Sequence, residues 1–168
     1  MNWQFPEKKI SVKNIWESFR LSLLVKKNAE GENFAKAKGK LRSIIGHEAS
    51  RFSFLENSEI LSEPERLQFA KLLELNHRGE FAMSDELLED SLFMLSGFLY
   101  RHYGQKAIIL IDEYDVPLDK AYQSGYYDDM VTLVRNLFGQ ALKTNSSLYF
   151  AVLTGYHHPH SNKDTESA

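Results

Sequence analysis

The sequence contains no cysteine, which excludes disulfide bonds, thiolate zinc sites and cysteine nucleophiles. It also lacks any apolar run of about 18 residues, the length that spans a bilayer, and residues 1–9 have no apolar segment of a secretory signal. Neither sign of charge dominates, since 20 Lys and Arg against 23 Asp and Glu give a net charge of −3, which does not favour a nucleic-acid-binding surface. We therefore expect a cytoplasmic protein without a membrane segment.

Apolar residues with helical spacing dominate the chain up to residue 104, and 168 residues at 43% hydrophobic content are enough for one domain with a sizeable core. The clearest helix begins after the capping residue Ser84, and another opens at a capping box formed by Ser62 and Glu65. The expected helices are residues 15–29, 34–45, 63–78 and 85–103. Glycines are expected to end the last three of them: Gly46, Gly79 and Gly104. The expected non-helical segments are a short strand at 10–12 and an irregular stretch at 47–61.

After Gly104 the pattern changes to that of an α/β unit. Residues 107–111 are apolar at every position and too few for a helix, which favours a strand covered on both faces. A loop containing Pro117 and Gly125, a helix around 130–141 and a second apolar stretch at 148–153 follow. A strand, a helix and a strand with short connections predict two parallel strands joined by a right-handed crossover.

Polar side chains follow both of these strands at their carboxyl ends. Asp112, Glu113 and Asp115 come after the first strand, and Thr154 comes after the second. Ligands of open parallel sheets bind outside the carboxyl ends of the strands. Two unit charges about 4 Å apart repel by roughly 4 kcal/mol at an effective dielectric of about 20, so a carboxylate cluster favours a bound cation. Oxygen ligands of this kind suit magnesium bound together with substrate phosphates.

Each of these four residues can be given a role in such a site. Asp112 would hold magnesium directly or through water, with Asp115 as a second metal ligand. Glu113 would orient or deprotonate an attacking water, and Thr154 would sense a phosphate by hydrogen bonding. The structural alternative is that Asp112 and Asp115 only cap the loop after the strand, as Asp often does in turns.

The stretch "AIILIDEYDVP" resembles the Walker B element of a P-loop ATPase, and "LYFAVLTG" is similar to the sensor strand that follows it. From Ser84 to Gly155 the chain resembles the AAA-ATPase-like domain of bacterial proteins that often carry a C-terminal PD-(D/E)XK nuclease domain, above all in "DEYDVP" and "GYYD". The resemblance implies an α/β fold, a partial P-loop NTPase (AAA-like) parallel sheet with flanking helices. It also implies ATP and Mg²⁺ as cofactors and ATPase activity for the parent protein.

Two features depart from the pattern of such domains. The sequence has no phosphate-binding loop G-x-x-x-x-G-K-[ST], because its only Gly-Lys pair, Gly39-Lys40, is followed by Leu41 and preceded five positions earlier by Phe34. After Gly155 a polar segment, "YHHPHSNKDTESA", takes the place of further strands and helices. We therefore expect a partial domain over residues 1–155 and a polar tail over 156–168, inactive in hydrolysis alone.

The missing part of the domain has a consequence for the sheet. The strand that leads into the phosphate loop of such domains would lie beside residues 148–153. Without it these residues would form an open apolar edge, which favours pairing with another chain and thus self-association. Nucleotide is the other expected partner, and nucleic acid is expected only through a nuclease domain of the parent protein.

Two other functions remain open. Asp112, Glu113 and Asp115 form a magnesium site for phosphodiester hydrolysis in one of them, although metal nucleases normally add a lysine or histidine that the sequence does not place. A non-catalytic binding or vestigial module is the other, favoured by the missing loop. Tyrosines near the carboxylates could stack a base, although cover for the sheet edge or a helix start is the simpler interpretation: Tyr114, Tyr122, Tyr126 and Tyr127.

Overall fold

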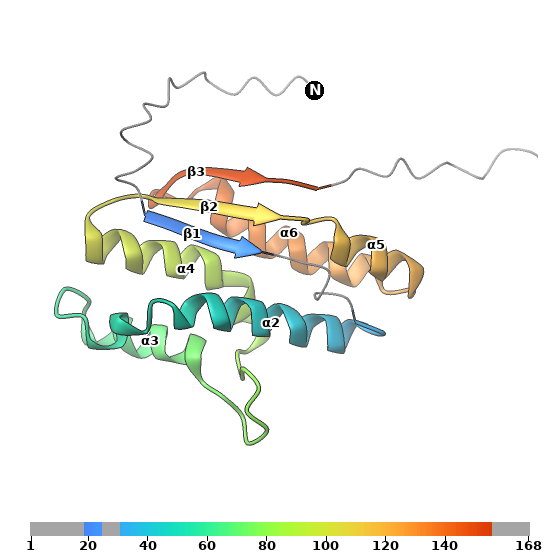
Figure 1. Ribbon diagram of the computed structural model, residues 1–168, viewed down its shortest axis with the longest axis horizontal. Coiled ribbons are helices and arrows are strands. Elements are labelled where there is room, and N and C mark those ends of the chain that lie inside the picture. The colour runs from blue at the N-terminus through green and yellow to red at the C-terminus, as the bar shows by residue number, and fades with distance from the viewer. Residues whose placement is uncertain (1–18, 25–30, 156–168) are drawn as a thin grey trace, which may run out of the picture.

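The computed structural model describes the backbone of residues 19–24 and all of residues 31–155 (Figure 1). Its strands are β1 (Phe19–Leu24), β2 (Ala107–Asp112) and β3 (Leu148–Leu153). They form a three-stranded sheet in the order β1-β2-β3, with both neighbouring pairs parallel. The expected α/β class with a parallel sheet is thereby confirmed, and β2 is the central strand.

Helices cover the sheet in two successive groups. Their bounds are α2 (Phe34–Ser50), α3 (Glu63–Leu73), α4 (Asp85–Tyr103), α5 (Val116–Gln123) and α6 (Tyr127–Lys143), with a 3-10 turn η2 at Ser53–Asn57. The long helices α4 and α6 pack side by side along the sheet (Figure 1). Helix α2 packs against α4 and the edge strand β1, and α3 packs against α2 and α4. No helix in the described part of the chain is long and apolar enough to cross a bilayer.

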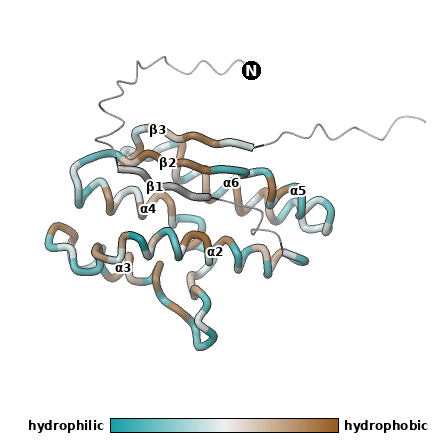
Figure 2. The backbone as a smooth tube through the Cα atoms, viewed as in Figure 1, coloured by the Kyte–Doolittle hydropathy of each residue, from teal (hydrophilic) through white to brown (hydrophobic). Residues whose placement is uncertain are grey.

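The core lies between the sheet and these helices. Ile109 and Ile111 of β2 are almost fully buried and belong to one apolar cluster with residues from α2, α3, α4 and α6. Figure 2 shows the apolar character of β2 and β3 beside the mixed surfaces of the helices. β2 is paired on both sides and packs against helices, so its apolar residues are buried or half-buried. Only Asp112, at the carboxyl end of the strand, is exposed.

The predicted signals of α4 are confirmed atom by atom. The Ser84 hydroxyl accepts a hydrogen bond from the Leu87 amide at 3.1 Å, and Gly104 closes the helix in the left-handed conformation at φ 68°. Its buried face carries the leucines that the sequence spacing selected: Leu88, Leu92, Leu95 and Leu99. At the start of α3, the Glu65 carboxylate accepts bonds from the amide and the hydroxyl of Ser62, both 2.8 Å long.

The helix predicted over 15–29 is wrong where the structure describes it. Residues 19–24 form β1, which pairs with β2 from Phe19 opposite Ala107 to Leu24 opposite Asp112. The sequence FRLSLL fits both periods, because Phe19 and Leu23 are four apart while apolar and polar residues also alternate along it. Pairing with the buried strand β2 decided between them. The short strand predicted at 10–12 and the tail at 156–168 lie outside the described residues.

Two glycines that were predicted to end helices have other roles. Gly46 lies inside α2, which continues to Ser50, and the Phe81 ring packs so closely that a methyl group at Gly46 would come 2.3 Å from its Cδ1. The 3-10 turn η2 then occupies part of the stretch predicted as irregular. Gly79 has φ 75° in the turn that joins the bridged residues Leu75 and Phe81, so α3 ends earlier, at Leu73.

The loop predicted around Pro117 contains a helix. Pro117 occupies the first turn of α5, where its missing amide hydrogen costs nothing because no intrahelical acceptor exists there. Gly125, at φ 78°, makes the turn from α5 into α6. This short helix leads the chain away from the carboxyl end of β2 directly after the three carboxylates, and so it shapes the candidate site.

Candidate functional site at the carboxyl end of the sheet

Asp112 and Thr154 form a polar pair at the carboxyl end of the sheet. The backbone ladder continues past the strands: the Thr154 amide donates to the Ile111 carbonyl at 2.9 Å, and the Tyr114 amide donates to the Thr154 carbonyl at 3.2 Å. This ladder holds the Thr154 hydroxyl against Asp112, where it donates a hydrogen bond to carboxylate Oδ1. Two residues 42 positions apart in the sequence therefore meet through the pairing of β2 with β3.

Glu113 leaves the strand in a strained conformation. Its φ of 54° is the only positive value among the described non-glycine residues, and this left-handed region costs an L residue on the order of 1 kcal/mol. The Glu113 carboxylate is half-buried and makes no hydrogen bond or ion pair with another residue of the described part. Strain of this kind clusters at functional sites, and the unbonded carboxylate remains available to a ligand or a water.

Asp115 does not act as a side-chain cap. Its backbone carbonyl accepts bonds from the Leu118 and Asp119 amides, both 2.9 Å long, but its carboxylate makes no capping bond to α5. Within the described residues, its buried Oδ1 has no hydrogen-bond partner. Gly155 lies against it, since a methyl group there would come 2.7 Å from that oxygen. The capping alternative is therefore wrong for the Asp115 side chain.

The donor set suits magnesium that brings other ligands with it. Among the side chains of residues 31–155, no group of three or more acidic or histidine residues could hold a metal ion by itself. Magnesium bound with phosphates needs only one or two protein carboxylates, and Asp112 is exposed while Asp115 has an unbonded oxygen. The arrangement offers no support for a self-sufficient metal site of the nuclease kind.

The tyrosines near the site divide into two kinds. Tyr126 is 8% exposed, and its hydroxyl donates to the Gly31 carbonyl at 2.7 Å, so it fixes the chain before α2 to the start of α6. Tyr122 and Tyr127 lie at the surface with their rings edge to face, 5.9 Å between centroids. Tyr126 therefore covers the start of α6, as the simpler interpretation predicted, and does not present its ring for stacking on a base.

The family of the chain can be assigned from its sequence. A family model described as "Predicted AAA-ATPase" (AAA-ATPase_like) matches residues 4–160 of the 168. The chain belongs to this family. The match includes all three strands, so it covers the carboxylates after β2 and Thr154 together. Comparisons with curated proteins and with solved structures found no match.

Two features at the carboxyl end of the sheet were not anticipated from the sequence. One is the left-handed backbone of Glu113, for which an acidic residue gives no signal, since glycine and asparagine are the usual residues there. The other is the close approach of Gly155 to Asp115. A glycine two residues after the end of β3 was the available signal, because such a position often admits a neighbouring group.

Proposed function

We propose that this chain contributes the magnesium-binding and water-activating side of an ATP-hydrolysing site. The observation that carries the proposal is the Asp112–Thr154 pair at the carboxyl end of a parallel sheet, where open α/β sheets bind their ligands. Membership of the predicted AAA-ATPase family supports ATP as that ligand. The apolar strand ending in Asp112 and Glu113 supports a Walker B role for both carboxylates.

The proposed roles follow from what each group can bond. Asp112 would hold magnesium directly or through water, with Asp115 beside it, and the bound ion would offset the negative charge of the phosphates. Glu113 has no partner in the described part of the chain, so its carboxylate can accept a proton from water or orient it. The Thr154 hydroxyl fixes one oxygen of Asp112 and would sense the terminal phosphate.

The phosphate-binding loop is the part of such a site that the 168 residues do not contain. In P-loop proteins the amides and the lysine of that loop hold the phosphates, so its absence removes these phosphate contacts. We therefore expect weak binding of nucleotide and no hydrolysis by this chain alone. An associated nuclease domain, and any nucleic-acid target, would be properties of a parent protein.

The absence of the phosphate-binding loop also favours a second candidate, a non-catalytic module in which the carboxylates have no role in hydrolysis. Equilibrium binding of a fluorescent ATP analogue separates the two. We expect binding that requires magnesium, that weakens tenfold or more in Asp112→Ala, equivalent to about 1.4 kcal/mol, and that persists in Glu113→Ala. Glu113 is not required for binding in this proposal, because its role is toward water.

Glu59→Ala is the matched control, since Glu59 is an exposed carboxylate in the segment between η2 and α3, away from the sheet end. It should bind the analogue as the wild type does. An absence of binding up to millimolar nucleotide would refute the ATPase proposal and leave the non-catalytic module. Equal binding by wild type and Asp112→Ala would mean that nucleotide binds elsewhere on the chain.

A further inference from the structure

The outer edge of β3 has no strand beside it among the described residues. β3 pairs with β2 alone, and the sheet order β1-β2-β3 leaves its other side open. Thr154 directs both its amide and its carbonyl toward the β2 side. Because backbone groups alternate in direction along a strand, Leu153 and Ala151 direct theirs to the open edge.

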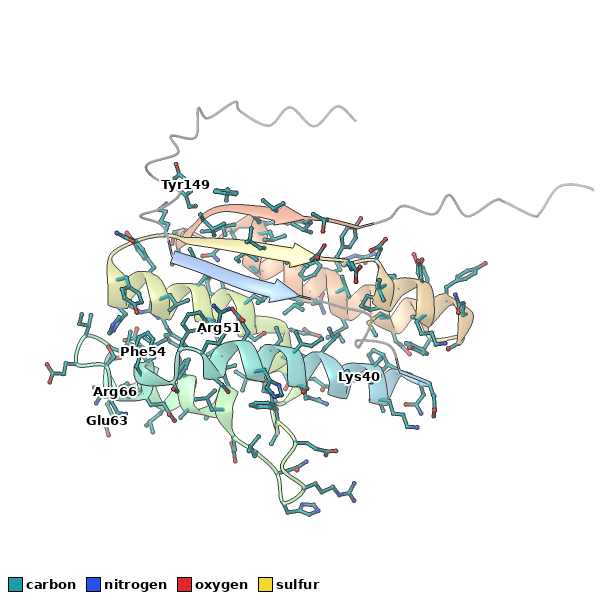
Figure 3. All side chains as sticks on the ribbon, in the orientation of Figure 1. Lys40, Arg51, Phe54, Glu63, Arg66 and Tyr149 are labelled. Atoms are coloured by element: carbon teal, nitrogen blue, oxygen red, sulfur yellow. The ribbon has the colours of Figure 1, made fainter. Side chains whose placement is uncertain are left out.

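Among the described residues this edge lacks the charges, the prolines and the covering element that usually prevent pairing, and its one register irregularity lies at the start of β3, where Leu148 and Phe150 pair with the consecutive residues Ala107 and Ile108. Its sequence LYFAVL contains no charged residue and no proline, and the exposed fractions of Val152 and Leu153 are 41% and 38%. Tyr149 extends from the start of β3 away from the helices (Figure 3). Edge strands without charge, proline or cover pair readily with another strand.

An apolar groove runs along α6 next to this edge. It has a volume of about 410 Å³, and its lining includes Leu153 of β3 and Tyr114. The helix contributes a stripe at intervals of three and four residues: Val131, Val134, Phe138 and Leu142. An open strand edge and an apolar helix stripe thus lie together, one in the sheet layer and one in the helix layer.

We propose that a second copy of this chain covers both features through a two-fold axis, with β3 antiparallel to the partner's β3 and α6 antiparallel to the partner's α6. A two-fold interface uses the same surface from each copy, so an edge and a stripe on one molecule meet an edge and a stripe on the other. The three described strands of each copy join in one continuous sheet, and the two stripes bury each other.

The charges at the two ends of α6 fit this arrangement, whereas Arg135, midway along the groove, comes close to the partner's Arg135 at the two-fold axis and opposes it. Asp128 lies in the first turn, three residues before Val131 on the side of the stripe, and Lys143 is the last residue of the helix and lines the groove. Neither forms an ion pair with another described residue. Antiparallel α6 helices place Asp128 of one copy next to Lys143 of the other, twice in each dimer. The pairing concerns the sheet edge and holds whether or not the chain binds nucleotide.

Sedimentation velocity over a concentration series tests the interface. We expect a monomer–dimer equilibrium for the wild type. Asp128→Lys and Lys143→Asp should each weaken the dimer tenfold or more, because each places like charges opposite one another at two positions. An equimolar mixture of the two variants should dimerise about as well as the wild type, since each mixed dimer restores both opposite-charge pairs.

The mixture is the deciding measurement, and Ala151→Pro tests the strand edge separately. Proline removes an outward amide and leaves the β2 pairing intact, so it should abolish dimerisation while circular dichroism shows the wild-type fold. A wild type that stays monomeric at every concentration would overturn the proposal. So would a mixture as monomeric as its components, because that result requires a partner surface other than this one.

Discussion

Tyr126→Phe should destabilise the chain, because it removes a buried hydrogen bond while it keeps the aromatic ring. The Tyr126 hydroxyl donates to the Gly31 carbonyl at 2.7 Å, and both residues are buried. The ring keeps its place beside Phe34, with 6.3 Å between the ring centroids, so phenylalanine retains the apolar contacts. What changes is that the carbonyl of Gly31 loses this donor in a place that water does not reach freely.

The expected loss follows from the cost of an unsatisfied buried acceptor. Removing one partner of such a bond costs about 1–3 kcal/mol, more than the net value of the bond itself. For a chain of this size, 1 kcal/mol corresponds to about 2–4 °C in the midpoint of thermal unfolding. We therefore expect the midpoint to fall by about 4–8 °C for a loss near 2 kcal/mol, with a matching shift of the urea midpoint at unchanged slope.

Tyr127→Phe is the matched control, because Tyr127 is the next residue and is 38% exposed. A surface hydroxyl contributes little, so its stability should stay within about 0.5 kcal/mol of the wild type. If Tyr126→Phe unfolds as Tyr127→Phe does, the link between α6 and the chain before α2 contributes nothing to stability. Tyr126 would then be open again to a binding role.

Two further outcomes are expected. Glu113→Gly should be more stable than Glu113→Ala by about 1 kcal/mol in urea unfolding, because glycine adopts a φ of 54° without strain and alanine does not. If the alanine variant is the more stable one, residue 113 is not strained. The Lys38 hydrogen bond, followed by the charges of Lys38 and Arg42, holds the pKa of Asp85 below its ordinary value of 3.8. The stability that the Asp85 carboxylate contributes is therefore present at neutral pH and is lost as the pH falls through the lowered pKa. Asp85→Asn should accordingly destabilise the chain at about pH 7 and much less at about pH 3. An equal loss of stability at both pH values would exclude this link between α2 and α4.

Local signals in the sequence were sufficient for the part of the chain with strong caps and a single period. Ser84 and Gly104 fixed both ends of α4, because the groups that cap a helix lie within a few residues of it. The run from Ala107 to Ile111 identified β2, since a strand buried on both faces needs apolar residues at every position. The placement of Asp112 and Thr154 at neighbouring strand ends followed from the βαβ pattern, and the structure joins them by a hydrogen bond.

Only the tertiary structure decided features that depend on neighbours distant in the sequence. The FRLSLL segment became a strand because β2 offered a partner along its whole length, which no local period encodes. The Phe81 ring packs against Gly46 inside α2, and Gly155 packs against the unbonded oxygen of Asp115. Periodicity and caps are local and can be read from the sequence, whereas pairing, close approach and the direction of a side chain are decided by contacts that form only in the folded chain.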